Sequence, residues 1–110
     1  MAGEGYTGGR PNPVWLPHWE YLGGQVIAGD GGSQAATLPA NTQIFEIDAE
    51  GGNIQYAINL GFAPPAASGF CPENAARIQG PLENLTALAV NMAVGVTAHI
   101  LYYREYVRRR

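Results

Sequence analysis

Between Thr42 and Leu60, apolar and polar residues alternate in two runs. The runs are residues 42–49 and 53–60, and a Glu-Gly-Gly linker at positions 50–52 separates them. Alternation with a period of two is typical of strands that bury one face, and a short glycine-containing linker between two such strands predicts a β-hairpin. The side chains expected on the buried faces are Phe45, Ile47, Ala49, Ile54, Tyr56, Ile58 and Leu60.

The polar positions of the first run place two carboxylates on the opposite face. Glu46 and Asp48 are two residues apart, so both are expected to point away from the core. Paired carboxylates can act as general acid and base or bind a divalent cation. We favour a solvated strand face, because no third carboxylate or histidine accompanies them in the run.

The longest apolar run covers residues 94–106. Its β-branched and aromatic residues predict a strand with two apolar faces, which is typical of the centre of a sandwich or of a strand under a subunit interface. The preceding run, 85–92, is expected to pair with it antiparallel through a tight turn at 93–95. A shorter strand is expected at 25–28. The glycine-rich turn that follows it at 29–32 lacks the Lys-Ser/Thr pair and the helix of a phosphate-binding loop.

The segment from residue 1 to residue 22 has a different character. Three prolines within positions 11–17 exclude a helix and favour an extended backbone. Both tryptophans of the chain, Trp15 and Trp19, lie here together with Tyr21. Such an arm either packs along its own domain or reaches a neighbouring subunit. We favour the neighbouring subunit, because Trp and Tyr contribute strongly to protein interfaces.

Glycine and proline separate the apolar runs throughout the chain. The 110 residues include 15 Gly and 8 Pro, which predicts short strands joined by many turns. The predicted fold class is all-β, a small antiparallel β-sandwich or barrel with an extended N-terminal arm. The predicted organisation is an arm at 1–22, one β-sandwich domain at 23–107 and a basic tail at 108–110.

Charge is scarce and unevenly distributed. Only 14% of the residues are charged, and a small domain with so little charge tends to expose apolar contact surfaces, so we expect a subunit of an assembly. Residues 1–107 contain three Arg against nine Asp and Glu. Such an acidic body is not expected to bind nucleic acid, which requires a basic face. The terminal Arg run at 108–110 is expected to be solvated, with contact to a phosphate or an acidic partner as the alternative.

The chain offers few groups for catalysis or metal binding. Its two histidines, His18 and His99, and its one cysteine, Cys71, do not lie at metal-ligand spacing, and no serine lies in a nucleophile-elbow motif. We therefore expect a non-enzymatic protein without catalytic residues, metal or cofactor. His99 is expected to bond to backbone or to a neighbouring group, and Cys71 to be a small buried apolar residue.

The sequence also lacks the marks of export. It does not begin with a charged segment followed by an apolar core, and no apolar run reaches the length of about 20 residues needed to span a bilayer. Neither a signal peptide nor membrane association is therefore expected. The expected location is a cytosol or a particle assembled there.

Three segments carry a further signal, namely EGGNIQYAIN at 50–59, GPLENL at 80–85 and TAHILYYRE at 97–105. Together they resemble small structural proteins encoded among the head and tail genes of tailed bacteriophages and prophages. The resemblance spans residues 43–105, a little over half of the chain. The aromatic arm and the terminal Arg run lie outside it.

The resemblance implies a virion structural protein of the head-decoration, or cement, type. Such a protein would bind the major capsid protein on the capsid surface as an oligomer, expected to be a trimer, in a particle assembled in the host cytoplasm. We expect the contact residues to be Trp15, Trp19 and Tyr21 in the arm, with Ile100 and Tyr102 at a subunit contact. Two alternatives remain open: a tail or head–tail connector component, and a small carbohydrate- or peptide-binding β module.

Overall fold

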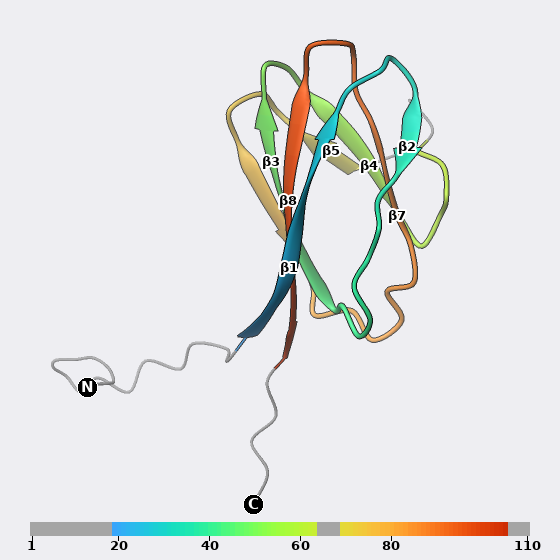
Figure 1. Ribbon diagram of the computed structural model, residues 1–110, viewed down its shortest axis with the longest axis vertical. Helices are drawn as coiled ribbons and strands as arrows, with labels where there is room; N and C mark the ends of the chain where they lie inside the picture. Colours follow the sequence, from blue (N-terminus) through green and yellow to red (C-terminus); the bar gives the residue numbers. More distant parts are fainter. Residues whose placement is uncertain (1–18, 64–68, 106–110) are drawn as a thin grey trace, which may run out of the picture.

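The computed structural model describes residues 19–63 and 69–105, and within these ranges it contains two antiparallel four-stranded sheets and no helix (Figure 1). The strand order is β1-β8-β3-β6 in sheet A and β2-β7-β4-β5 in sheet B. The predicted all-β sandwich is therefore confirmed. The strands are β1 (Trp19–Ala28), β2 (Ser33–Ala35), β3 (Ile44–Glu50), β4 (Ile54–Ile58), β5 (Gly69–Cys71), β6 (Ala76–Gln79), β7 (Leu88–Asn91) and β8 (Thr97–Glu105).

The two strand orders correspond position by position. In sheet A the strands β1, β8, β3 and β6 occupy the places that β2, β7, β4 and β5, their neighbours in the sequence, occupy in sheet B. Four of the connections that cross from one sheet to the other therefore join corresponding strands as arches, namely β1–β2, β3–β4, β5–β6 and β7–β8. Two four-stranded sheets with this order form a jelly roll. Figure 1 shows the four arches together at one end of the sandwich.

The predicted hairpin between residues 42 and 60 is wrong in its pairing, although both of its strands form. β3 pairs with β6 and β8, whereas β4 pairs with β5 and β7. The predicted pairing of 85–92 with 94–106 is wrong for the same reason, because β7 and β8 lie in different sheets. A short linker allows either a hairpin or an arch. The arch places the apolar faces of successive strands against each other across the core, where burial of that surface stabilises the fold.

Backbone hydrogen bonds connect the arches to each other and to β3 at this end of the sandwich. The N–H of Gly29 donates to the carbonyl oxygen of Val96 at 2.7 Å, which links the β1–β2 arch to the β7–β8 arch. The N–H of Ala49 donates to the carbonyl oxygen of Ala75 at 3.0 Å, which links β3 to the β5–β6 arch. Gly51, with a φ of 87°, lies so close to the β7–β8 arch that a side chain there would meet backbone. Its glycine is thus required by conformation and by space.

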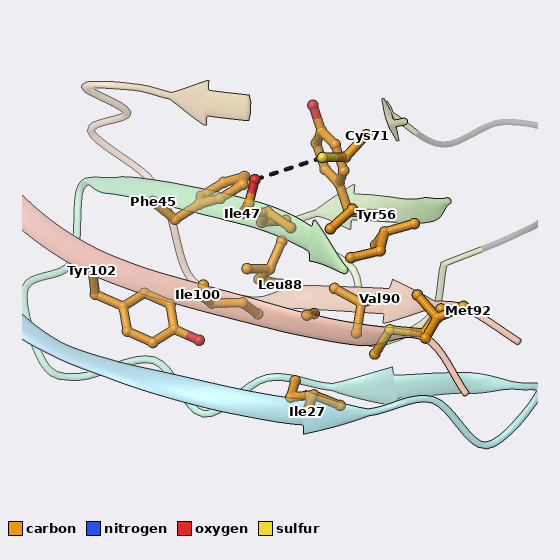
Figure 2. Close-up of a cluster of buried hydrophobic side chains, with 14 residues drawn as sticks. Ile27, Phe45, Ile47, Tyr56, Cys71, Leu88, Val90, Met92, Ile100 and Tyr102 are labelled. Atoms are coloured by element: carbon orange, nitrogen blue, oxygen red, sulfur yellow. Dashed lines mark hydrogen bonds between the residues drawn. The ribbon is translucent and has the colours of Figure 1, made fainter. Parts of the chain in front are cut away.

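Large apolar side chains from both sheets fill the space between them (Figure 2). The rings of Phe45 on β3 and Tyr56 on β4 meet edge to face with centroids 5.8 Å apart. Burial is confirmed for most of the predicted positions, and Ile58 is partly buried. The principal members of the cluster are Ile27, Phe45, Ile47, Ile54, Tyr56, Cys71, Leu88, Val90, Met92, Ile100 and Tyr102.

Leu60 lies outside this core, contrary to its predicted burial. Its side chain is 53% exposed. β4 ends at Ile58, and Asn59 has a φ of 61°, which breaks the alternation of an extended strand before Leu60 is reached. Phe62, in the same connection, is also exposed. The connection therefore presents apolar side chains to the surface.

Candidate functional site: the outer face of sheet A

Sheet A presents its outer face over the strands β1, β8, β3 and β6. Side chains alternate along each strand, so the register identifies those that share this face. Aromatic and apolar residues lie toward β1, and carboxylates lie on β3. The outer-face residues used below are Trp19, Tyr21, Val26, Glu46, Asp48, Glu50, Ile78, His99, Leu101 and Tyr103.

Three aromatic rings form a cluster at one end of this face. The ring of Tyr103 lies 5.7 Å from that of Trp19 and 5.8 Å from that of Tyr21, measured between centroids. The two contacts are tilted and edge-on, which are favourable arrangements for aromatic pairs. Tyr21 remains 59% exposed. Burial raises the pKa of the Tyr103 hydroxyl, and the nearby carboxylate of Glu46 raises it further, so Tyr103 is a neutral hydrogen-bonding group at neutral pH.

Trp19 and Tyr21 belong to the sheet. β1 begins at Trp19, which pairs with Glu105, and Tyr21 pairs with Tyr103. The register shifts between Tyr21 and Gly23, so Leu22 is an additional residue in β1, as in a β-bulge. The shift changes which residues of β8 lie opposite the first three residues of β1. Residues 19–22 are thus structurally continuous with the domain. Trp15 and the rest of 1–18 lie outside the described residues.

The Trp19 side chain has a further property. Within the described part of the chain, its indole N–H is buried and has no hydrogen-bond partner. A buried donor without an acceptor costs about 1–3 kcal/mol.

Carboxylates occupy the other part of the face. Glu46, Asp48 and Glu50 alternate along β3, and Asp48 lies opposite His99 on β8. The His99 Nε2 atom lies 2.7 Å from the Glu50 Oε1 atom. Burial raises the pKa of Glu46, and repulsion by Asp48 and a hydrogen bond between the two carboxyl groups raise it further. The face is therefore acidic near β3 and aromatic near β1.

This acidic row differs from the sequence interpretation in one respect. Glu46 and Asp48 were expected to lack a third carboxylate or a histidine, but β3 continues to Glu50 and its pairing with β8 brings His99 beside them. The contact between Glu50 and His99 links residues 49 positions apart, so no local pattern could reveal it. The searched residues, which are the described ones, contain no group of three His, Cys, Asp or Glu side chains arranged to hold a metal ion.

The predicted subunit-contact residues on β8 point the other way. Ile100 is 0% exposed and Tyr102 is 1% exposed, and both lie between the two sheets (Figure 2). The Tyr102 hydroxyl donates to the Gln25 Oε1 atom at 2.8 Å. Neither side chain is available at the surface of the folded chain. Their neighbours Leu101 and Tyr103 face outward instead.

Cys71 lies in the core, as expected. Its side chain is 0% exposed, and the sulfur lies 3.3 Å from the carbonyl oxygen of Ala75 and 3.6 Å from that of Ile47. Burial raises the pKa of the thiol. Cys71 is therefore a structural residue, not a nucleophile.

A polar cleft of about 500 Å³ lies at the end of the sandwich away from the arches. Arg104 and Glu83 line it, and Asn41 at its rim has a φ of 69°. The Arg104 Nε atom donates to Glu20 at 2.8 Å, and both of these side chains are partly exposed. This ion pair is worth little in stability because solvent screens it. The carboxylates beside Arg104 make the cleft unsuited to an anion.

No protein-family model, curated protein or solved structure matches the chain. Among the residues that the structure describes, no helix is long and apolar enough to cross a membrane.

Proposed function

We propose that the protein is a non-enzymatic structural component of a virion, which binds the capsid of a tailed bacteriophage as an oligomeric decoration subunit. The observation that carries the proposal is the partly exposed aromatic cluster of Trp19, Tyr21 and Tyr103 on the outer face of sheet A. Aromatic side chains are enriched in the cores of protein interfaces. Trp19 and Tyr21 are the last aromatic residues of the arm predicted at 1–22, so in this proposal the arm and the face contribute to one contact surface.

Two further features support a role in an assembly. Large apolar side chains are exposed on several separate elements of a chain that has only 14% charged residues. The jelly roll is also a fold of viral capsid domains, which is an analogy at the level of the fold and not evidence of function. The exposed large apolar residues are Tyr21, Val26, Leu60, Phe62, Phe70, Ile78 and Val94.

Binding to empty heads of the phage that encodes the protein tests this proposal. The variant Tyr21→Ser removes an exposed ring of the cluster and should reduce cosedimentation with the heads by at least about tenfold. The matched control is Val94→Ser, because Val94 is 78% exposed on an arch. Removal of residues 1–18, which precede β1, should reduce binding further. Equal binding by the Tyr21 and Val94 variants, or no binding by the unaltered protein, would contradict the proposal.

Carbohydrate binding is the second candidate, and one observation favours it. The exposed ring of Tyr21 lies on the same face as the carboxylates of Glu46 and Asp48. Rings can stack on sugars while carboxylates accept hydrogen bonds from their hydroxyl groups. Saturable binding of an oligosaccharide that Tyr21→Ser abolishes, without binding to heads, would support this candidate. A tail or connector role would show as binding to isolated tails or portals.

A further inference from the structure

The strand β1 forms an edge of sheet A, and it lacks the usual protection of edge strands. Among the residues that the structure describes, β8 is the one strand that pairs with it. Residues 23–28 read GGQVIA and contain no ionisable side chain and no proline. Natural proteins usually place charge or proline on such an edge, or cover it, because unpaired N–H and C=O groups recruit other strands. This segment of β1 is thus open to pairing.

The register shows which backbone groups face outward from the edge. Ala28 lies opposite Thr97, and the N–H of the next residue, Gly29, donates to the Val96 carbonyl oxygen. Backbone groups alternate in direction along a strand, so those of Gly24 and Val26 point away from β8. The Ala28 carbonyl points the same way, and the Gln34 side-chain amide caps it at 2.8 Å. The side-chain cap at Ala28 marks the end of the open stretch.

The backbone groups of Gly24 and Val26 are therefore free to bond to another strand. Among the described residues, the N–H and C=O groups of Gly24 and Val26 make no hydrogen bond. Both residues are exposed, and the Val26 side chain is 65% exposed. The inward side chain of Gln25, between them, is held by the Tyr102 hydroxyl and by the N–H of Thr37. The open stretch is consequently held in an extended conformation.

We propose that β1 pairs antiparallel with β1 of a second copy of the chain, about a two-fold axis at Gln25. Gly24 of each copy then lies opposite Val26 of the other. Each of these two pairs exchanges two backbone hydrogen bonds, so four bonds join the copies. The two A sheets become one eight-stranded sheet, a case of strand addition at an open edge.

A second copy of the chain is the proposed partner because two β1 edges fit each other. A Val26 side chain from one copy lies beside Gly24 of the other, where the Leu101 side chain covers the outer face, and it packs against that side chain. It also meets the ring of Tyr21, whose hydroxyl already lies close to Gly24. Two of the exposed large apolar side chains, Tyr21 and Val26, are thereby covered at once.

Charge does not oppose the contact between two acidic chains. The acidic row of Glu46, Asp48 and Glu50 lies on β3, two strands away from the β1 edge. In the paired sheet, five strand spacings, or about 24 Å, separate the row of one copy from that of the other, which is about three times the screening length at physiological salt. Repulsion between the rows is therefore screened. The pairing does not depend on the proposed capsid binding and concerns the isolated protein.

Mass measurement and amide exchange on the full-length protein test the pairing together. Light scattering at about 100 μM should give twice the monomer mass of 11.7 kDa. The amides of Gly24 and Val26 should exchange at least about tenfold more slowly at that concentration than in dilute solution, because they become hydrogen-bonded only in the dimer. A monomer at high concentration would overturn the proposal. So would a dimer in which these two amides exchange rapidly, or a monomer in which they are protected.

Substitutions at Val26 test whether the backbone N–H of this residue is needed for the dimer. Val26→Pro removes an N–H that faces away from β8, so it breaks no bond within the chain and should give a folded monomer. Val26→Thr keeps the N–H and the β-branched shape, and it should remain a dimer. A folded Val26→Pro protein that dimerises as strongly as the unaltered chain would overturn the proposal. If Val26→Pro does not fold, the exchange measurement on the unaltered protein decides.

Discussion

The buried hydroxyl of Tyr102 makes the stability of the folded protein depend on pH. Its hydroxyl is enclosed between the sheets and bonds to Gln25, and burial raises its pKa to about 12. The unfolded chain holds the same proton with a pKa of about 10. Since the folded state binds the proton more tightly, its stabilising effect is complete below pH 10 and is lost as the pH rises toward 12.

Alkaline denaturation should therefore reveal Tyr102. The free energy of unfolding should fall by about 1.4 kcal/mol per pH unit between pH 10 and 12 because of this group. Tyr102→Phe should cost about 1 kcal/mol at pH 8, because the bond to Gln25 is lost, and should flatten the decline above pH 10. Chemical denaturation at pH 8, 10 and 11 measures both effects. The exposed Tyr21→Phe serves as control, and an equally steep decline in Tyr102→Phe would contradict the assignment.

The orientation of β8 shows why some residues could not be placed from the sequence. Both faces of this strand are apolar, since Ile100 and Tyr102 alternate with Leu101 and Tyr103. A shift of one position exchanges the buried and exposed sets, and the alternation alone does not distinguish them. The choice depends on β1 and β3, which flank β8 in the sheet. In β3, by contrast, polar residues alternate with apolar ones, and its buried face was correctly predicted.

Neighbouring arches pack closely against each other at the end of the sandwich. A methyl group added at Gly29 would overlap the carbonyl oxygen of Ala93 in the neighbouring arch. Backbone cannot move aside without breaking the bond from Gly29 to Val96. Gly29→Ala should therefore lower the free energy of unfolding by about 1–3 kcal/mol, the range typical of overpacking. Gly61→Ala is the matched control, because that position has open space around it. Equal stability of the two variants in urea denaturation would contradict close packing of the arches.

Strand positions were predictable from the sequence, whereas strand partners were not. The alternation in 42–60 identified β3 and β4 because it depends on residues that are adjacent in the sequence. Pairing depends on contacts far apart in sequence, such as that of β1 with β8. A linker such as 51–53 fits a hairpin turn and an arch equally well. His99 of the candidate site was missed for the same reason, since the distant strand β8 supplies it, whereas Glu50 was missed because β3 continues one residue beyond the alternating run 42–49.

The main core of the molecule lies between the two sheets, and each sheet covers one side of it. Cys71 of sheet B contacts the Ile47 carbonyl of sheet A, so its sulfur lies where the two sheets meet (Figure 2). The arch that follows Cys71 is bonded to β3 through Ala49 and Ala75. A reagent can therefore reach the thiol only after contacts of both sheets have broken. Labelling of Cys71 is consequently expected to follow the loss of the contacts between the two sheets.

We expect the native protein to resist a water-soluble thiol reagent at neutral pH. Burial excludes the reagent and also raises the pKa of the thiol, which lowers the fraction of reactive thiolate. In urea, the labelling midpoint should coincide with the midpoint measured by circular dichroism, because the described residues form one small sandwich that is expected to unfold in one step. A Cys71→Ala protein is the control for labelling at other groups. Labelling that precedes the loss of β-structure would show that β5, the three-residue edge strand that carries Cys71, opens separately from the rest of the sandwich.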